Sequence, residues 1–225
     1  VVANHNVNLD LCEGEILALL GENGSGKTTL MNMLSGIYFP DSGEIHVHGK
    51  EVSIRAPKDA FDLGIGMIHQ HFKLVDVLTA AENIVLGLPG GVRINRKALS
   101  EKIREISSRY GFDIDPDKKV YNMSVSEKQT VEIIKVLYRG ADILILDEPT
   151  RGIDIGTKTE IQKLVLDLAD QGMAVTFISS EVEEMLRTCS RMGVLRDGKK
   201  VGEISGDQLT QEGVMKAIAG GDSDE

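Results

Sequence analysis

The sequence predicts an α/β fold, in which helices cover both faces of a mainly parallel β-sheet. Two apolar, β-prone runs at residues 143–146 and 173–178 enclose a helical pattern at 158–170, and this alternation is typical of parallel strands joined by crossover helices. A third apolar run, at 17–20, ends in a glycine-rich turn that precedes a helix start at 27–34. The repeated order of strand, loop and helix therefore predicts a parallel-sheet core.

Two antiparallel features accompany the predicted core. The alternating pattern at 44–48, the turn at Gly49-Lys50 and a continuation at 52–54 predict an antiparallel β flap near residues 44–56. Farther along the chain, Asp197-Gly198 separates two β-prone segments. This dipeptide between such segments predicts a β-hairpin.

The length of 225 residues suits a single domain built around one main core. Apolar residues recur at helical spacing in 95–110 and 124–138, so an inserted helical subdomain is expected between the two parts of the core. The polar, acidic end of the sequence is typical of disorder. We expect an α/β core at 1–78 and 141–219, a helical subdomain at 79–140 and a disordered tail at 220–225.

Composition excludes several classes of function. The net charge of -10 opposes broad attraction to nucleic acid or anionic lipid, because those partners require massed Lys and Arg. No apolar run approaches the ~20 residues that span a bilayer, so we expect neither nucleic-acid binding nor direct lipid insertion. Cys12 and Cys189 are far apart, which favours two reduced thiols over a disulfide or zinc site. Polar residues interrupt the start of the sequence at Asn4, His5 and Asp10, so we expect no signal peptide.

The segment 21–28 reads GENGSGKT, which has the Walker A spacing. It lies between a predicted strand and a predicted helix, so it indicates a P-loop NTPase core of the RecA-like type. In such a loop the backbone N–H groups surround phosphate oxygens, Lys27 reaches the β- and γ-phosphates, and Thr28 offers its hydroxyl to Mg²⁺. The candidate ATP-binding residues of this segment are Gly21, Glu22, Asn23, Gly24, Ser25, Gly26, Lys27, Thr28 and Thr29.

A second motif lies at the end of the apolar run 143–146, where Asp147 and Glu148 follow one another. Open α/β sheets bind their ligands at the carboxyl ends of the strands. We expect Asp147 to hold Mg²⁺ through water. Glu148 is the candidate base or water-positioning residue for attack on the γ-phosphate of ATP.

The sequence after this motif resembles ABC ATPases, the nucleotide-binding domains of ABC transporters. Glu148-Pro149-Thr150 followed by Gly152-Ile153-Asp154 is similar to the Walker B to D-loop stretch of that family. The segment 123–129, MSVSEKQ, stands where the family carries its LSGGQ signature, although its residues alone favour a plain serine helix cap and only its position indicates the signature. The resemblance implies further contacts to ATP, some of them across a dimer, by Ser124, Ser126, Glu127 and Asp154.

Two more catalytic residues follow from this resemblance. Gln70 matches the family's Q-loop, which contacts Mg²⁺ and water and leads to the surface that meets the membrane subunit; His69 and His71 beside it are expected to be packing or surface residues. Ser180 stands where the family usually has a switch histidine, and serine cannot act as a cationic donor, so we expect slow hydrolysis. The catalytic candidates are Glu148, Gln70 and Ser180, and the metal ligands are Thr28, Gln70 and Asp147.

The nearest resemblance is to importers of simple sugars and nucleosides, whose ATPase subunit contains two such domains in one chain. It implies a cytoplasmic ATPase that uses ATP and Mg²⁺, pairs with a second ATP-binding domain, and is held at the inner face of the cell membrane by transmembrane permease subunits. Residues 11–142 resemble the first of those domains, whereas 150–154 and 178–181 resemble the second. We therefore expect a composite of two half-sequences joined near Asp147.

Other interpretations remain open at this point. The serine at the switch position and the altered signature favour a regulatory half-site that binds ATP but hydrolyses it poorly. A soluble ABC ATPase acting on DNA or ribosomes is disfavoured by the net charge. No N-K-x-D segment follows Glu148, which argues against a GTPase. The family's adenine-stacking aromatic belongs upstream of Val1, and Tyr38 and Phe39 lie too far along the chain to replace it.

Overall fold

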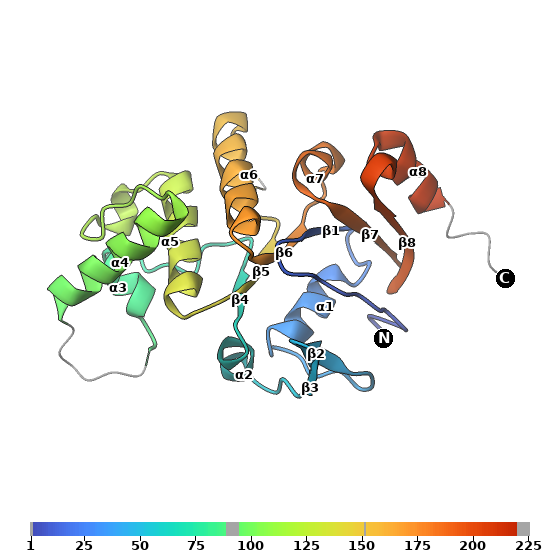
Figure 1. The fold of residues 1–225 in the computed structure, drawn as a ribbon, viewed down its shortest axis with the longest axis horizontal. Coiled ribbons are helices and arrows are strands. Elements are labelled where there is room, and N and C mark those ends of the chain that lie inside the picture. The colour runs from blue at the N-terminus through green and yellow to red at the C-terminus, as the bar shows by residue number, and fades with distance from the viewer. Residues whose placement is uncertain (1, 89–94, 151, 220–225) are drawn as a thin grey trace.

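The computed structural model describes residues 2–88, 95–150 and 152–219, and a six-stranded sheet runs through its centre (Figure 1). Its strand order is β4-β5-β6-β1-β7-β8. Every neighbouring pair is parallel except β7 and β8, which form an antiparallel hairpin. The strands are β1 (Ile16–Leu20), β4 (Ile65–Ile68), β5 (Ile143–Asp147), β6 (Ala174–Ile178), β7 (Arg191–Arg196) and β8 (Lys199–Ser205). The predicted α/β fold with a parallel core is confirmed.

Helices cover both faces of this sheet because its central strands are apolar on both sides. In β1, Ile16 and Ala18 belong to the cluster beneath α6 (Ile155–Asp170), α7 (Val182–Thr188) and α8 (Gln211–Ala219). Leu17 and Leu19 point the opposite way, into a second cluster with α1 (Lys27–Leu34) and α2 (Pro57–Asp62). Successive side chains of a strand alternate between its faces, and Figure 1 shows the two layers of helices on opposite sides of the sheet.

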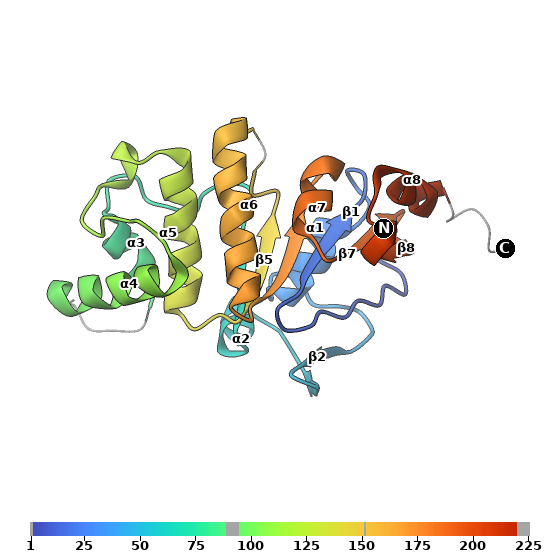
Figure 2. The same ribbon diagram turned by 45° about the horizontal axis from the view of Figure 1, so that its top comes forward.

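A group of helices lies beside α6 at one end of the sheet, as Figure 2 shows. It contains α3 (Ala80–Val85), α4 (Arg96–Tyr110), the short 3₁₀ turn η1 (Val120–Asn122) and α5 (Val125–Tyr138). Thr79, Asn95 and Ser124 cap α3, α4 and α5, each accepting a hydrogen bond from a backbone N–H in the first turn. Such caps fix where a helix begins. The helices predicted at 95–110 and 124–138 are confirmed.

The β flap exists, but its second strand was predicted in the wrong place. β2 (Ile45–Val47) pairs with β3 (Lys50–Val52), not with a strand at 52–54. The reason is the turn: His48 and Gly49 both have positive φ values, of 51° and 73°. A two-residue turn of that kind returns the chain at once, so Lys50 already pairs with Val47.

Two elements predicted after β5 are present, a helix and a hairpin, and the helix begins earlier than predicted. The helix predicted from residue 158 begins at Ile155, because the carboxylate of Asp154 accepts a hydrogen bond from the backbone N–H of Thr157 and caps the first turn. The hairpin at Asp197-Gly198 is confirmed, and both residues have positive φ. The tail predicted at 220–225 lies outside the described residues.

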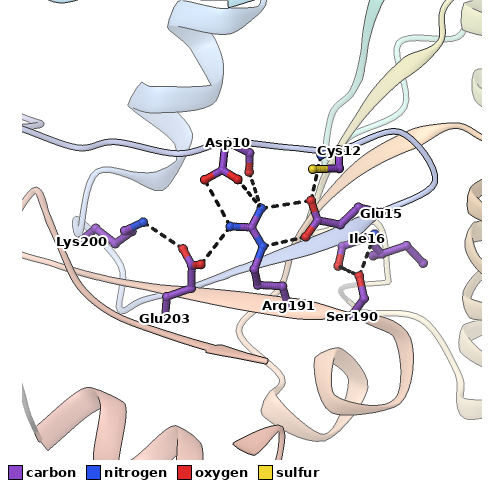
Figure 3. A network of polar contacts seen from close by, with 8 residues as sticks. All are labelled: Asp10, Cys12, Glu15, Ile16, Ser190, Arg191, Lys200 and Glu203. Carbon is purple, nitrogen blue, oxygen red and sulfur yellow. Dashed lines mark hydrogen bonds and ion pairs between the residues drawn. The ribbon is translucent and has the colours of Figure 1, made fainter. Parts of the chain in front are cut away.

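A network around Arg191 ties the segment before β1 to the far edge of the sheet (Figure 3). The guanidinium donates to both carboxylate oxygens of Glu15, at 2.6 and 3.0 Å, and to Glu203 of β8 at 2.9 Å. It also donates to the backbone oxygen of Asp10 at 2.5 Å. Lys200 forms a further ion pair with Glu203 at 2.9 Å. This network fixes the path of residues 10–15 into β1.

Candidate functional site

Four loops meet at the carboxyl edge of the parallel strands. The strand order places β1 beside β6, β6 beside β5 and β5 beside β4. The glycine-rich loop follows β1, and Gln70 follows β4. Glu148 follows β5 directly, while Ser180 lies two residues after the end of β6. Segments that are far apart in the sequence therefore converge at one edge, where α/β sheets bind ligands.

A cavity of about 550 Å³ opens at this edge. Asp147 and Glu148 line it together with Gln70 and most of the glycine-rich loop. The predicted residues among its lining are Asn23, Gly24, Gly26, Lys27, Thr28, Thr29, Gln70, Asp147 and Glu148. Gly21, Glu22 and Ser25 belong to the same loop but are not among the described lining residues. A volume of this size is within the ordinary range for a small-molecule site.

The glycines of the loop are required by its conformation. Gly24 and Gly26 have φ values of 87° and 97°, a region that side chains disfavour. A Cβ atom on Gly26 would lie 2.5 Å from the Ala3 carbonyl oxygen and closer still to Asn4 Oδ1. Because Gly26 is also the N-cap of α1 and carries no side chain, the first N–H groups of that helix are left to bind an anion.

Lys27 lies at the floor of this loop. Its Nζ atom donates to the carbonyl oxygens of Gly21, at 2.5 Å, and Glu22, at 3.0 Å. Burial lowers the pKa of the Lys27 ammonium, and the nearby charges of Glu148 and Asp147 oppose that shift. Its contacts to carbonyl oxygens can be exchanged for phosphate oxygens, which are better acceptors for an ammonium group.

The two carboxylates at the end of β5 have different surroundings. Asp147 is buried, and burial raises the pKa of its carboxyl group, against the opposing charges of His69 and Lys27. Glu148 is less buried and has a positive φ of 50°, while its backbone N–H donates to the Ile178 carbonyl at 2.9 Å. A residue other than glycine in this region is strained, and such strain is concentrated at functional sites.

Ser180 contacts the outer of these carboxylates. Its hydroxyl donates to Oε2 of Glu148 at 3.3 Å, although Ser180 is not among the described residues that line the cavity. The half-buried His69 lies close enough to Asp147 to feel its charge; burial, and then the charge of Lys73, lower the pKa of the His69 imidazole, and the charge of Asp147 opposes them. The structure therefore brings Ser180 into contact with Glu148, and the switch role of Ser180 stays a prediction.

The oxygen donors in the cavity suit a magnesium ion. Thr28 offers a hydroxyl, Asp147 a carboxylate and Gln70 an amide oxygen, and all three residues line the same space. Mg²⁺ prefers oxygen ligands and is usually held by one or two protein groups, with phosphate oxygens and water completing its shell. These residues fit that requirement.

The residues assigned to the signature and D-loop lie apart from this cavity. Ser124 and Glu127 form a capping box at the start of α5: the Ser124 hydroxyl accepts from the Glu127 N–H, and the Glu127 carboxylate accepts from the Ser124 N–H. Ser126 donates to Glu160 of α6 at 2.8 Å, and Asp154 caps α6. Within one chain Ser124, Glu127 and Asp154 stabilise helix starts and Ser126 links α5 to α6, and none of the four is among the described residues that line the cavity.

A second cavity, of about 420 Å³, lies between the start of α5 and the loop that follows β5. Val125 and Lys128 line it from α5, and Pro149 and Ile153 from that loop. Gln70 lines both cavities. Within one chain the start of α5 therefore does not line the first cavity. It lines the second cavity, which shares Gln70 with the first.

Sequence reasoning missed part of the lining of the first cavity. Val2, Ala3, Ile178, Asp197 and Gly198 also line it. Two contacts hold the N-terminal segment there: the His5 N–H donates to the Gly198 carbonyl at 2.7 Å, and the Asn4 amide donates to the Gly26 carbonyl at 3.2 Å. The Asp197-Gly198 hairpin marked the turn, but nothing in the local pattern showed that the turn reaches the glycine-rich loop.

Comparisons with known proteins find a family and several curated relatives that this chain resembles. The family profile described as ABC transporter matches residues 4–151. The chain is 47% identical over 214 residues to the nucleoside import ATP-binding protein NupA of Lactococcus lactis, covering 94% of the chain and 42% of that protein. It is 45% identical over 222 residues to the guanosine import ATP-binding protein NupO of Bacillus subtilis, covering 98% and 44%. The chain spans less than half the length of these curated relatives.

Solved structures of ATP-binding cassettes have the same fold. A cassette of an ABC transporter in its ADP conformation superposes with a TM-score of 0.84 at 22% identity, covering 97% of this chain and 92% of that one. A dimeric bacterial ABC transporter cassette gives a TM-score of 0.74 at 26% identity, covering 90% of each chain. With the profile match over most of its length and the identity to curated relatives, the chain belongs to the ABC transporter family of ATP-binding proteins.

Proposed function

We propose that this cassette binds Mg²⁺-ATP in the first cavity and that its hydrolysis drives import of a nucleoside or sugar through separate membrane subunits. The observation that carries the proposal is the meeting of Lys27, Asp147 and Glu148 in one cavity beside the glycine-rich loop. The relatives named above support the transported class, since their names specify nucleoside and guanosine import. A further relative, from Clostridium perfringens, is a ribose import ATP-binding protein that is 39% identical over 226 residues, covering 98% of this chain and 45% of that protein.

The residues of the cavity have different roles in phosphoryl transfer. The N–H groups at the start of α1 and the ammonium of Lys27 bind the β- and γ-phosphates. Thr28, Asp147 and Gln70 would hold Mg²⁺, which neutralises charge on the phosphates when bound. Glu148 orients a water molecule toward the γ-phosphate and accepts its proton. The hydroxyl of Ser180, 3.3 Å from Glu148, keeps that carboxylate turned toward the cavity.

The partners of this ATPase are two kinds of subunit. A second ATP-binding domain would bring its signature segment to the open side of the cavity, and a similar cassette has been solved as a dimer. Permease subunits would contact the surface formed by the loop that follows Gln70. Two apolar side chains are exposed there: Val77 of that loop, at 68%, and the adjacent Tyr121, at 60%. This contact would hold the protein in the cytoplasm, at the inner membrane face. No helix within residues 2–88, 95–150 and 152–219 has the length and apolar character to cross a membrane.

A regulatory half-site that hydrolyses ATP poorly is the second candidate function. Ser180 favours it, because the hydroxyl that contacts Glu148 cannot supply the positive charge of a protonated histidine. Electrostatic donors aimed at the transferred phosphate contribute strongly to catalysis. The two candidates share the same ATP site and differ in turnover.

The test is ATP turnover of the purified chain, measured beside ATP binding on the same samples. We expect slow turnover that falls by about 100-fold or more in Glu148→Gln, since a positioned general base contributes at least that much, and that rises in Ser180→His. ATP affinity should change little in either variant, because the glycine-rich loop is untouched. Binding without turnover in all three proteins would reject the motor and leave the half-site; no binding would reject both.

A further inference from the structure

The carboxyl group of Glu184 lies between the two loops that carry Glu148 and Ser180. Glu184 belongs to α7 and is only 4% exposed. Its Oε2 atom accepts hydrogen bonds from the Thr150 hydroxyl at 2.7 Å and from the Ser179 hydroxyl at 2.9 Å. Its Oε1 atom accepts one from the Gln162 side chain of α6 at 3.3 Å. A buried carboxyl group is thus satisfied by three side-chain donors from three different segments.

Two of these donors are close to catalytic residues in the sequence. Thr150 is two residues after Glu148, and Ser179 immediately precedes Ser180. Both Thr150 and Ser179 are buried. Ser179 also accepts a hydrogen bond from the Glu181 N–H at 3.0 Å, so its hydroxyl shapes the turn on which Ser180 lies. Through Oε2 alone, Glu184 joins the loop after β5 to the loop after β6.

Among the residues that the structure describes, backbone pairing between these two loops ends before the Glu184 contacts. The register of β5 and β6 ends at Asp147 opposite Ile178, and the Glu148 N–H makes one more bond to Ile178. Beyond that point no backbone hydrogen bond between described residues joins the two loops. Hydrogen bonds to a buried charged or polar acceptor are strong because water does not compete for them, so the Glu184 contacts can fix the separation of the loops.

We propose that Glu184 is a positioning residue, which holds Ser180 and Glu148 in register so that the Glu148 carboxylate points at the attacking water. The inference rests on the proposed hydrolysis of ATP. Because the glycine-rich loop follows β1 and makes no described contact with Glu184, loss of this network should lower kcat and leave KM for ATP unchanged.

The test compares Glu184→Gln with Glu183→Gln, the neighbouring exposed carboxylate on the same helix. Glu184→Gln replaces one carboxylate oxygen, which accepts hydrogen bonds, by an amide NH₂ group, which donates them. The donors Thr150 and Ser179 then lose a carboxylate acceptor. We expect its kcat to fall about tenfold or more while KM stays within about twofold, the pattern of an interaction used only in the transition state. Glu183→Gln should match the wild type. Adding Ser180→Ala to Glu184→Gln should cause no further loss, because the two residues act as a unit.

Hydrogen exchange supplies a readout that does not depend on turnover. In Glu184→Gln the backbone amides of Glu148 and Glu181 should lose protection together, whereas amides of α4 keep theirs. Thr150→Val, which removes one donor, should show part of the fall in kcat and part of the loss of amide protection. Thr150→Ser keeps the hydroxyl, so its kcat and amide protection should lie close to the wild-type values. These two variants decide the question if Glu184→Gln does not fold.

Three results would overturn the assignment. They are an unchanged kcat for folded Glu184→Gln, full additivity with Ser180→Ala, or exchange that rises only within α7. A wild-type chain without turnover rejects the proposed function instead, and the exchange measurement then decides alone whether Glu184 joins the two loops. Unaltered protection at both Glu148 and Glu181 in that case rejects the positioning role.

Discussion

Gly24 and Gly26 are separated by one residue and serve different structural purposes. Both have positive φ, so each avoids the strain that any side chain would meet there. Only Gly26 is also crowded: a Cβ atom there would meet Asn4 and Ala3, whereas nothing lies within 4 Å of a Cβ on Gly24. Of these two Walker A glycines, Gly24 is therefore needed for conformation alone and Gly26 for both conformation and close packing.

We expect Gly26→Ala to destabilise the fold more than Gly24→Ala. Gly24→Ala should lower the free energy of unfolding by about 1–2 kcal/mol, the strain of the left-handed region. Gly26→Ala should lower it by about 3 kcal/mol or more, because the added methyl must also displace residues 3 and 4. Urea unfolding without nucleotide measures both. Equal losses would show that the N-terminal segment does not rest on the loop.

At the scale of secondary-structure elements, ionised side chains stabilise the β7–β8 edge of the sheet more than they stabilise its centre. Burial acts to raise the pKa of Glu15, but hydrogen bonds from Arg191 and the Cys12 N–H outweigh it and leave that pKa lowered. Hydrogen bonds from Lys200 and then Arg191 lower the pKa of Glu203. The Arg191 side chain is only 13% exposed. The segment before β1, the strand β7 and the strand β8 are thus linked by charges that acid can remove.

This network predicts a specific loss of stability in acid. A carboxylate with a lowered pKa in the folded state stabilises the protein above its unfolded pKa, near 4.5, and this contribution is lost as the pH falls through the folded value. We expect the free energy of unfolding to fall below about pH 5 in the wild type. Arg191→Met should be about 2 kcal/mol less stable at pH 7 and should show a shallower pH dependence in urea unfolding.

The matched control for this prediction is Arg187→Met. Arg187 forms an exposed ion pair with Glu183, and such pairs contribute little to stability. Its free energy of unfolding should stay within about 0.5 kcal/mol of the wild type at every pH. If the free energy of unfolding of Arg191→Met kept the full pH dependence of the wild type, carboxylates other than those drawn in Figure 3 would be responsible for that dependence.

The boundaries of elements were predictable where capping chemistry marks them. Ser124 and Glu127 form a capping box, so the start of α5 could be predicted from the sequence. α8 was missed, since Gln211–Ala219 carries Gly213 and buries fully only Val214. Its position depends on contacts with β8 and β7. The second flap strand was predicted too late because the turn was placed at Gly49-Lys50, whereas His48 and Gly49 form it. His-Gly is not among the residue pairs that mark a two-residue hairpin turn most strongly.

At the scale of the whole molecule, the proposed function requires a second copy or a second domain, because the chain's own signature segment is not among the described residues that line its first cavity. We expect Glu148→Gln to double its mass in solution with Mg²⁺-ATP, because bound ATP that is not hydrolysed holds the two cassettes together. Lys27→Ala, which binds ATP weakly, should stay monomeric. Analytical ultracentrifugation distinguishes the two states. A monomer under all conditions would rule out the homodimer and require a second domain of different sequence.

The composite origin expected from the sequence stays a prediction. Residues 11–142 and 150–154 resemble different domains of the two-domain importers, yet the strands contributed by both parts form one sheet: β1 and β5 each pair with β6 in register. The apolar clusters on the two faces likewise contain residues from both parts. Packing across the proposed junction is therefore continuous.

Local residue order was enough to predict a P-loop ATP site and to place its motifs. Walker A spacing, paired carboxylates after an apolar strand and the segment through Asp154 are all short motifs, and each required local structure is set by short-range conformational preferences. Long-range packing settled which other residues complete the site. Val2 and Gly198 are remote in sequence from most of the motif residues that line the same cavity, and Glu184 lies 34 residues from Thr150, which it contacts. Strand order and loop packing bring these residues together. Such contacts arise from burial of the whole core and leave no periodic or spacing signal in the chain.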